Sequence, residues 1–197
     1  MFGMPVSDPL LIVITGPVGG GKSSTGLASA HALRSPDQSV AVIDLDQMYG
    51  FVRQEPGYGE LVGWRRARAG AAALANTLFD SGMRVVIVEG EFFNADELST
   101  LLTPIQPRVR RLFVTLQVSY SRALIRVQGD PSRGLSKDPS ILHSMHTYFA
   151  QCLPFLEETS VVIDGDSRTL DEVVAQVLDA VTTGGASPSA EADKRAV

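Results

Sequence analysis

Short apolar runs alternate with longer stretches of helical spacing along most of the chain. Their near-continuous apolar character is typical of strands in a parallel sheet that is covered on both faces. Five such runs predict strands at Leu10–Thr15, Val40–Asp44, Arg84–Glu89, Arg111–Val118 and Val161–Asp164. The stretches between and after them predict helices at Lys22–Arg34, Leu61–Ser81, Ala95–Leu102, Tyr120–Gln128, Ser140–Leu153 and Thr169–Val181.

This alternation predicts an α/β fold of three layers, in which helices cover both faces of a five-stranded parallel sheet. A length of 197 residues suits one domain, which we place at residues 10–182. Residues 1–9 and 183–197 are rich in small and polar side chains, so flexible ends are expected there. Residues 129–139 form a charged loop with Gly, Pro and Ser between two helices, and this predicts a short lid.

Composition excludes several classes of protein. The net charge of −5 argues against a broad basic surface for nucleic acid. The single cysteine, Cys152, excludes an internal disulfide framework and suits a reducing compartment. The first apolar run is too short to cross a bilayer and does not have the features of a signal peptide. We therefore expect a cytoplasmic monomer or homodimer that binds neither nucleic acid nor membranes.

A glycine-rich segment follows the first predicted strand and precedes the first predicted helix. Residues 16–23 read Gly-Pro-Val-Gly-Gly-Gly-Lys-Ser and match the phosphate-binding pattern G-x-x-x-x-G-K-[ST] in full. Glycines let backbone N–H groups wrap around phosphates, the lysine adds positive charge, and a serine hydroxyl can bind Mg²⁺. The spacing does not match the dinucleotide pattern G-x-G-x-x-G. The segment predicts a site for ATP and Mg²⁺ formed by Gly16, Gly19, Gly20, Gly21, Lys22, Ser23 and Ser24.

Two carboxylates end the second predicted strand, in the sequence Asp44-Leu45-Asp46. If the extended conformation continues, both side chains point to one face at the carboxyl edge of the sheet, where open α/β folds bind ligands. Phosphoryl transfer needs a metal beside the phosphates and a group that accepts the proton of the acceptor hydroxyl. We expect Asp44 to face Mg²⁺ and Asp46 to face the acceptor. The alternative is a solvated strand end with Asp46 as a helix cap.

On these residues the sequence resembles shikimate kinase and the wider group of small P-loop kinases, namely gluconate kinase, adenylylsulfate kinase and chloramphenicol phosphotransferase. The phosphate loop followed by Ile-Asp-Leu-Asp-Gln is similar to that group, and so is an Arg-Val helix that runs into a loop arginine. The resemblance implies the P-loop NTPase fold and a kinase activity. It also implies that Asp46 partners the acceptor hydroxyl, Arg126 packs on adenine and Arg133 closes over the transferred phosphoryl group.

The acceptor region departs from the shikimate kinase pattern. Glu89-Gly90-Glu91 stands where that family has three glycines, and Trp64-Arg65-Arg66-Ala67-Arg68 stands where it has Phe-Arg-x-x-Glu. The second substrate arginine of that family has no clear counterpart, so an acceptor other than shikimate is expected. By the resemblance Glu89 lies on the metal side, and the alternative is a polar strand end. Glu91 is expected to line an acceptor pocket. Arg65 and Arg68 stand on a long predicted helix, and either substrate contact or a solvated face explains them.

The leading hypothesis is a kinase that transfers the γ-phosphate of ATP to a hydroxyl of a small molecule. Its catalytic residues would be Lys22, Asp46 and Arg133. A P-loop ATPase or regulatory nucleotide-binding protein is the alternative class, and a nucleotide kinase is a variant, because several arginines occur between Arg53 and Arg68. His143 and His146 are too few for a zinc site, so both are interpreted as non-ligands.

Overall fold

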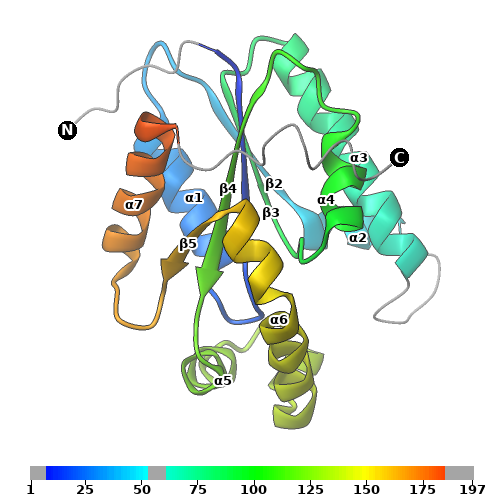
Figure 1. Cartoon of the computed structure of the whole chain (residues 1–197), viewed down its shortest axis with the longest axis vertical. Helices are drawn as coiled ribbons and strands as arrows, with labels where there is room; N and C mark the ends of the chain where they lie inside the picture. The colour runs from blue at the N-terminus through cyan, green and yellow to red at the C-terminus, as the bar shows by residue number, and fades with distance from the viewer. Residues whose placement is uncertain (1–7, 53–60, 185–197) are drawn as a thin grey trace.

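A parallel sheet forms the centre of the protein in the computed structural model, which describes residues 8–52 and 61–184 (Figure 1). The strands lie in the order β2-β3-β1-β4-β5, and every neighbouring pair is parallel. The predicted five-stranded parallel sheet is therefore confirmed. The strands are β1 (Leu10–Thr15), β2 (Val40–Asp44), β3 (Val85–Glu89), β4 (Arg110–Gln117) and β5 (Val161–Asp164).

Helices cover both faces of the sheet, as predicted. Helices α1 (Lys22–Leu33) and α7 (Leu170–Thr183) lie on one face. Helices α2 (Leu45–Val52), α3 (Leu61–Asp80) and α4 (Ala95–Leu102) lie on the other. Helix α5 (Tyr120–Gly129) and the first half of α6 (Pro139–Thr159) lie beyond the carboxyl ends of the strands, with a 3₁₀ turn, η1 (Leu135–Lys137), between them (Figure 1).

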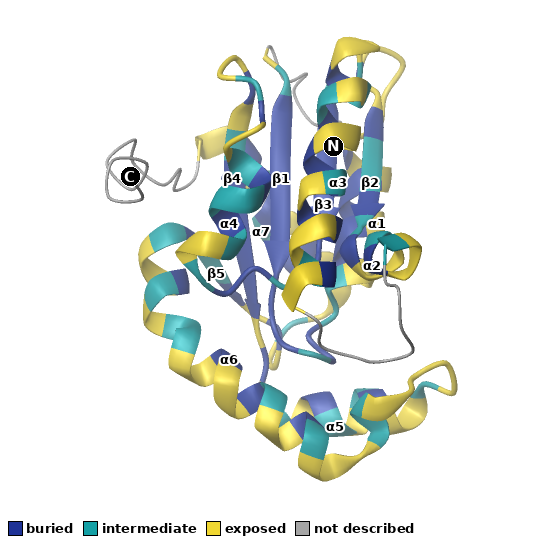
Figure 2. Cartoon of the chain, turned by 90° about the vertical axis from the view of Figure 1, so that its right-hand side faces the viewer, coloured by how far each residue is buried: buried dark blue, intermediate teal, exposed yellow. Residues whose placement is uncertain are grey.

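Strand β1 supplies both halves of the core, because alternate side chains of a strand point to opposite faces. Leu11 and Val13 pack with α3 and α4, whereas Leu10, Ile12 and Ile14 pack against α1 and α7. All six residues of β1 are buried (Figure 2). The phosphate loop therefore follows a strand that is held on both faces.

Two helices differ from their prediction. Helix α2 was not predicted; it is short, but Leu45, Met48, Tyr49 and Val52 place apolar side chains at helical spacing against the core. Helix α6 continues through Pro154 to Thr159, beyond the predicted end at Leu153. Pro154 has no N–H for the carbonyl of Ala150. Ala150 is exposed, so that carbonyl can be hydrated and the helix continues.

The fold extends slightly further toward both ends of the chain than the predicted domain, residues 10–182. The carbonyl oxygen of Pro9 accepts a hydrogen bond from the N–H of Arg110 at 2.8 Å. Helix α7 reaches Thr183 and closes on Gly184, whose φ of 72° suits glycine. Residues 1–7 and 185–197, where flexible ends were predicted, lie outside the described residues.

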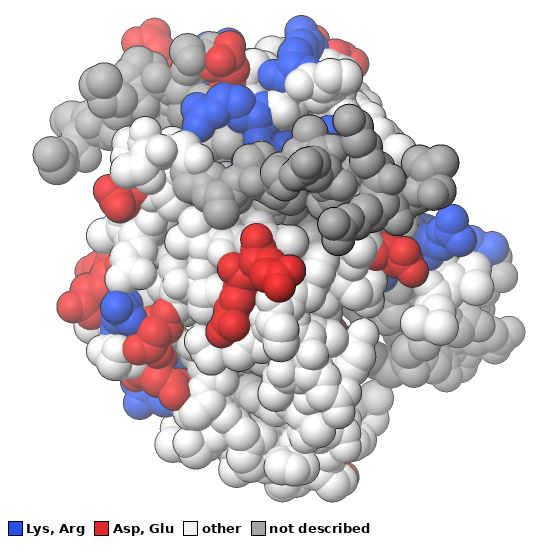
Figure 3. Space-filling view, in the orientation of Figure 1, with Lys and Arg blue, Asp and Glu red and all other residues white. Residues whose placement is uncertain are grey.

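No helix in the described residues is both long and apolar enough to cross a membrane. On the part of the surface that Figure 3 describes, charged side chains lie in several separate groups, and one group near the centre is acidic.

Candidate active site

The phosphate loop between β1 and α1 needs its glycines for conformation and for space. Gly19 and Gly21 have φ values of 76° and 93°, a region that other residues rarely adopt. A Cβ atom on Gly16 would lie 2.6 Å from the carbonyl oxygen of Leu116 on the neighbouring strand. Helix α1 begins at Lys22, so its free N–H groups and positive dipole end face the loop. The loop has the shape of a cradle for phosphate groups.

The side chains of Lys22 and Ser23 lie in and beside this cradle. The Nζ of Lys22 donates hydrogen bonds to the carbonyl oxygens of Gly16 at 3.0 Å and Pro17 at 3.2 Å. Burial raises the pKa of Glu89 above its usual value, and a hydrogen bond with Ser23 partly opposes this rise. Glu89, at the end of β3, is only 4% exposed. Ser23 and Glu89, both predicted on the metal side, therefore lie together.

Asp44 and Asp46 do not share an extended segment, so that expectation was wrong. Helix α2 begins at Leu45, and one carboxylate oxygen of Asp44 accepts hydrogen bonds from the N–H groups of Asp46 at 2.8 Å and Gln47 at 3.2 Å. This arrangement caps the helix, because it satisfies N–H groups that have no partner within the first turn. The cap is thus Asp44, whereas the sequence had offered Asp46.

Asp46 lies in the first turn of α2 and faces the phosphate loop. Burial raises the pKa of Asp46, and the positive charges of Lys22 and Arg133 partly oppose this rise. Asp44 adds repulsion that raises it further. The structure thus brings the three predicted catalytic residues, which come from α1, α2 and the 129–139 loop, within electrostatic range of one another.

A cavity of about 350 Å³ opens beside the glycines of the loop. One wall is Arg126 of α5, whose guanidinium donates hydrogen bonds to the carbonyl oxygens of Gly19 at 3.2 Å and Gly165 at 3.0 Å. Leu116, Leu170 and Val173 line its apolar side. An apolar wall with a few polar groups suits an adenine ring. The stacking of adenine on Arg126 stays a prediction.

The predicted lid, residues 129–139, consists of a turn followed by η1, and most of it is exposed. Asp130 organises the turn by accepting hydrogen bonds from the hydroxyl of Ser132 at 2.6 Å and from Arg133 at 3.1 Å. Both Asp130 and Arg133 line the cavity. Arg133 therefore borders the nucleotide cavity and also lies within the field of Asp46.

Arg68 of α3 is not on a solvated helix face. It is 7% exposed, and its Nη2 atom contacts a carboxylate oxygen of Glu97 at 3.0 Å and the carbonyl oxygen of Glu91 at 2.9 Å. Its guanidinium lies over the ring of Phe92, which is fully buried. These contacts attach α3 to the segment after β3. Arg65, in contrast, is exposed.

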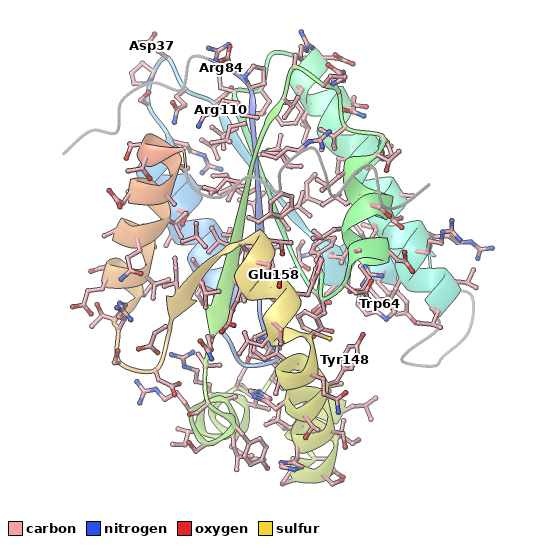
Figure 4. The ribbon with its side chains drawn as sticks, viewed as in Figure 1. Asp37, Trp64, Arg84, Arg110, Tyr148 and Glu158 are labelled. Carbon is pink, nitrogen blue, oxygen red and sulfur yellow. The ribbon has the colours of Figure 1, made fainter. Side chains whose placement is uncertain are left out.

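Glu91 stands between Arg68 and the phosphate loop. Burial raises the pKa of Glu91, with Lys22 and Arg68 opposing the rise and Asp46 and Glu97 adding to it. Across from it, Tyr148 of α6 lies with its ring centroid 6.0 Å from that of Phe93. Figure 4 shows Tyr148 on α6 below Trp64 of α3, at the carboxyl end of the sheet.

Two contacts at the site were missed from the sequence. His146, interpreted as a non-ligand without a further role, places Nε2 3.0 Å from the carbonyl oxygen of Val18 in the phosphate loop. Its position in the buried stripe of α6, with Leu142 and Phe149, is a signal that the spacing offered. Tyr49 stacks on Trp64 with ring centroids 4.1 Å apart, and this joins α2 to α3.

Arg53, which supported the nucleotide kinase variant, lies outside the described residues. Within residues 8–52 and 61–184, no three His, Cys, Asp or Glu side chains converge closely enough to hold a metal ion by themselves. Mg²⁺ at phosphate sites uses one or two protein groups together with phosphate oxygens and water. The hydroxyl of Ser23 and the carboxylate of Glu89 fit such an incomplete set.

No protein family and no curated protein matches the sequence. Solved structures do match. A gluconokinase from Sinorhizobium meliloti has a TM-score of 0.64 and 20% identity, and the match covers 90% of this chain and 94% of that chain. A shikimate kinase from Acinetobacter baumannii, in complex with shikimate, has a TM-score of 0.61 and 17% identity over 89% of this chain and 94% of that one. The chain has the fold of the small-molecule P-loop kinases.

The APS kinase of Mycobacterium tuberculosis shares this P-loop kinase fold with a TM-score of 0.55 and 17% identity, over 89% of this chain and 98% of that chain. The predicted resemblance to small-molecule P-loop kinases is therefore confirmed for the fold. At these identities the likeness does not identify an acceptor, which must be inferred from the site itself.

Proposed function

We propose that the protein is an ATP-dependent kinase that transfers the γ-phosphate to a hydroxyl group of a small molecule. The observation that carries this proposal is the position of Asp46. It lies in the first turn of α2, within electrostatic range of both Lys22 of the phosphate loop and Arg133 of the 129–139 loop. A group in that place is suited to receive the proton of a hydroxyl that attacks the γ-phosphate.

The direction of its pKa shift suits Asp46 to this role. A general base works best when its pKa lies near the working pH, and the pKa of Asp46 is raised from its usual value. In the proposed step the acceptor oxygen bonds to the γ-phosphorus while the bond from that phosphorus to the β–γ bridging oxygen breaks. Asp46 takes the hydroxyl proton, and ADP leaves with the bridging oxygen and its electron pair.

Lys22 and Arg133 are proposed to stabilise the negative charge that develops on the phosphoryl oxygens during transfer. Ser23 and Glu89 would hold Mg²⁺ or its water ligands, with Asp44 at the edge of that set. When bound, Mg²⁺ would neutralise phosphate charge. The 129–139 loop is proposed as the lid that brings Arg133 over the reacting group.

The nucleotide kinase variant has weaker support. It requires free arginines for a phosphate on the acceptor, but the guanidinium of Arg68 is held by Glu97 and the carbonyl of Glu91. Arg65 and Arg66 are exposed on the same helix. A regulatory ATPase remains the alternative class, and it would hydrolyse ATP without an acceptor.

Acceptor-dependent ATP consumption, measured over a panel of hydroxylated compounds, tests the proposal. We expect slow turnover of ATP alone and faster turnover with an accepted compound. Asp46→Asn should lower kcat by about 10²–10⁴-fold with little change in ATP affinity, because a positioned proton acceptor contributes that much. Asp37→Asn is the matched control, since Asp37 is exposed at the opposite end of the sheet (Figure 4).

Two results would contradict the proposal. One is rapid ATP hydrolysis that no acceptor accelerates, which would favour the regulatory ATPase. The other is an Asp46→Asn variant that transfers phosphate as fast as Asp37→Asn, which would remove Asp46 from the reaction.

A further inference from the structure

The charges of the acceptor side indicate which acceptors it excludes. We use "acceptor side" for the surroundings of Asp46, Glu91, Arg68 and Tyr148, which come from α2, the segment after β3, α3 and α6. Small anions are usually held in proteins by arginine, whose planar fork of N–H groups matches a carboxylate or phosphate. The question is therefore whether an arginine of this side is available to an anion.

Arg68 is the buried arginine on this side, and its positive charge is already paired. Its Nη2 atom lies 3.0 Å from a carboxylate oxygen of Glu97 and 2.9 Å from the carbonyl oxygen of Glu91. An anionic acceptor would have to displace Glu97, which would then lose its partner while partly buried. Arg65, one turn earlier on α3, is exposed.

The remaining groups make the acceptor side acidic. Asp46, Glu89 and Glu91 each interact electrostatically with Lys22, and Asp46 acts on both glutamates. The nearby positive groups, Lys22 and Arg133, belong to the phosphate loop and to the loop bordering the nucleotide cavity. Once phosphate groups occupy the phosphate loop, those cations are neutralised as well, and a carboxylate or phosphate on the acceptor would meet net repulsion.

One further group indicates what kind of ligand atom fits instead. The Nε–H of Arg68 is buried without a hydrogen-bond partner. A buried donor without a partner is unfavourable, so it calls for a ligand oxygen or a water molecule. Because Glu97 already neutralises the guanidinium, an uncharged hydroxyl or carbonyl oxygen satisfies this donor. The carboxylate of Glu91 can in turn accept a hydrogen bond from an O–H or N–H group of the ligand.

We propose that the acceptor side selects hydroxyl compounds that carry no anionic group, a class that includes polyols, neutral sugars and their amine-bearing derivatives. This inference rests on the proposed kinase function and narrows its substrate class. Glu91 and the Arg68–Glu97 pair are the groups that determine the selection.

The test compares molecules that differ only in charge. Sorbitol, gluconate and glucamine share one six-carbon chain, and thymidine, its 5′-phosphate and its 5′-amino derivative share one nucleoside. Binding to the full chain with Mg–ADP present is read from the emission of Trp64, the single tryptophan, which stacks on Tyr49 beside the acceptor side. Transfer is read from ATP consumption with the same six compounds.

We expect the neutral and amine members to bind and to accept phosphate, and the acid members to do so about 10–100-fold less well, because like charges at a binding site suppress a wrong partner. Glu91→Gln should shrink this discrimination by about tenfold, since it removes one repelling charge and keeps the shape. Asp96→Asn is the matched control, because Asp96 is exposed on α4 a few residues away. It should leave the discrimination unchanged.

Each of the other possible results has one interpretation. Stronger binding and faster transfer with the acid members would overturn the charge selection and leave the kinase function in place. Discrimination that Glu91→Gln and Asp96→Asn change equally would remove Glu91 from it. If none of the six changes the Trp64 emission or the ATP turnover, the acceptor side is not a binding site for such compounds and the inference fails. Fast hydrolysis without any acceptor would instead contradict the proposed function.

Discussion

The nucleotide side and the acceptor side of this site are built in different ways. The nucleotide side is made mainly of backbone from residues 16–23, a single turn between β1 and α1. The acceptor side is made of side chains that α2, α3, α6 and the segment after β3 bring together. A site made of backbone depends on glycines at fixed spacing, whereas a site made of side chains can change its ligand through a few substitutions.

The difference also determines whether a substitution on each side disrupts catalysis alone or stability as well. On the nucleotide side a change that keeps the backbone leaves the cradle in place and removes only the chemistry of one side chain. On the acceptor side Arg68 and Glu97 join α3 to α4, and Arg68 also belongs to the proposed site. Substitutions there should therefore affect stability and selectivity together.

The largest expected effect is on catalysis. It distinguishes a loss of chemistry on the nucleotide side from a loss of stability on the acceptor side. Lys22→Ala should lower kcat for transfer by about 10²–10³-fold, because one positioned charge or donor on the reacting group contributes that much. The free energy of unfolding should change little, since Lys22 is only half-buried and bonds just two loop carbonyls. Steady-state kinetics and chemical denaturation measure the two quantities.

The ATP affinity of Lys22→Ala and the mid-point of its denaturation check this interpretation. ATP affinity should fall, while the mid-point of denaturation stays close to that of the unchanged protein. Unchanged turnover in Lys22→Ala would end the assignment of the phosphate loop, and a large loss of stability would show that the loop depends on more than its backbone.

On the acceptor side, substitution of Arg68 is expected to lower the free energy of unfolding. Arg68→Met should destabilise the protein by about 3 kcal/mol, because it leaves Glu97 partly buried without its partner. Glu97→Leu combined with Arg68→Met should recover much of that loss, since a buried ion pair can often be replaced by apolar side chains. Denaturant titration of the two single variants and the double variant gives the coupling energy.

Arg65→Met is the matched control for this cycle, because Arg65 is exposed on the same helix. It should change stability by less than about 0.5 kcal/mol, as exposed substitutions usually do. Equal losses in Arg65→Met and Arg68→Met, or additive effects in the double variant, would mean that the Arg68–Glu97 contact does not hold α3 to α4.

The same contrast explains what could be predicted from the sequence. The parallel sheet, the phosphate loop and the start of α1 follow from local signals, since continuous apolar runs and a glycine pattern lie within a few residues of each other. The capping box of Thr169 and Glu172 at α7 is equally local. In such features the residues that contact one another are also close together in the sequence.

On the acceptor side, the residues that contact one another are far apart in the sequence. Arg68 pairs with Glu97 across two elements, and no local pattern distinguishes a buried arginine from a solvated one on α3. Helix α2 was missed because an eight-residue helix starts directly at the end of β2, where Asp44 reads equally well as a strand residue or as a cap. Asp46, Glu91 and Arg68 were therefore named from the sequence, but Tyr148 and the partners of Arg68 were not.

His146 links the two sides, because α6 carries it against the phosphate loop and carries Tyr148 against the acceptor side. Burial lowers the pKa of His146 below 6.5, Lys22 and His143 lower it further, and the Val18 carbonyl opposes the shift. The folded state thus binds its proton less readily than the unfolded state does. The resulting stability is present in full above about pH 6.5 and is lost as the pH falls below it, at up to about 1.4 kcal/mol per unit of pKa shift.

His146→Gln keeps an N–H donor for Val18 and does not titrate, so this pH dependence should disappear. Between pH 7.5 and 5.5 the unchanged protein should lose more stability than this variant, measured by denaturant titration. The carboxylates with raised pKa values are common to both proteins, so their contribution cancels in the difference. His31→Gln, at an exposed site on α1, is the control and should retain the original slope. Parallel curves for the unchanged protein and His146→Gln would show that the contact with Val18 does not depend on the neutral imidazole.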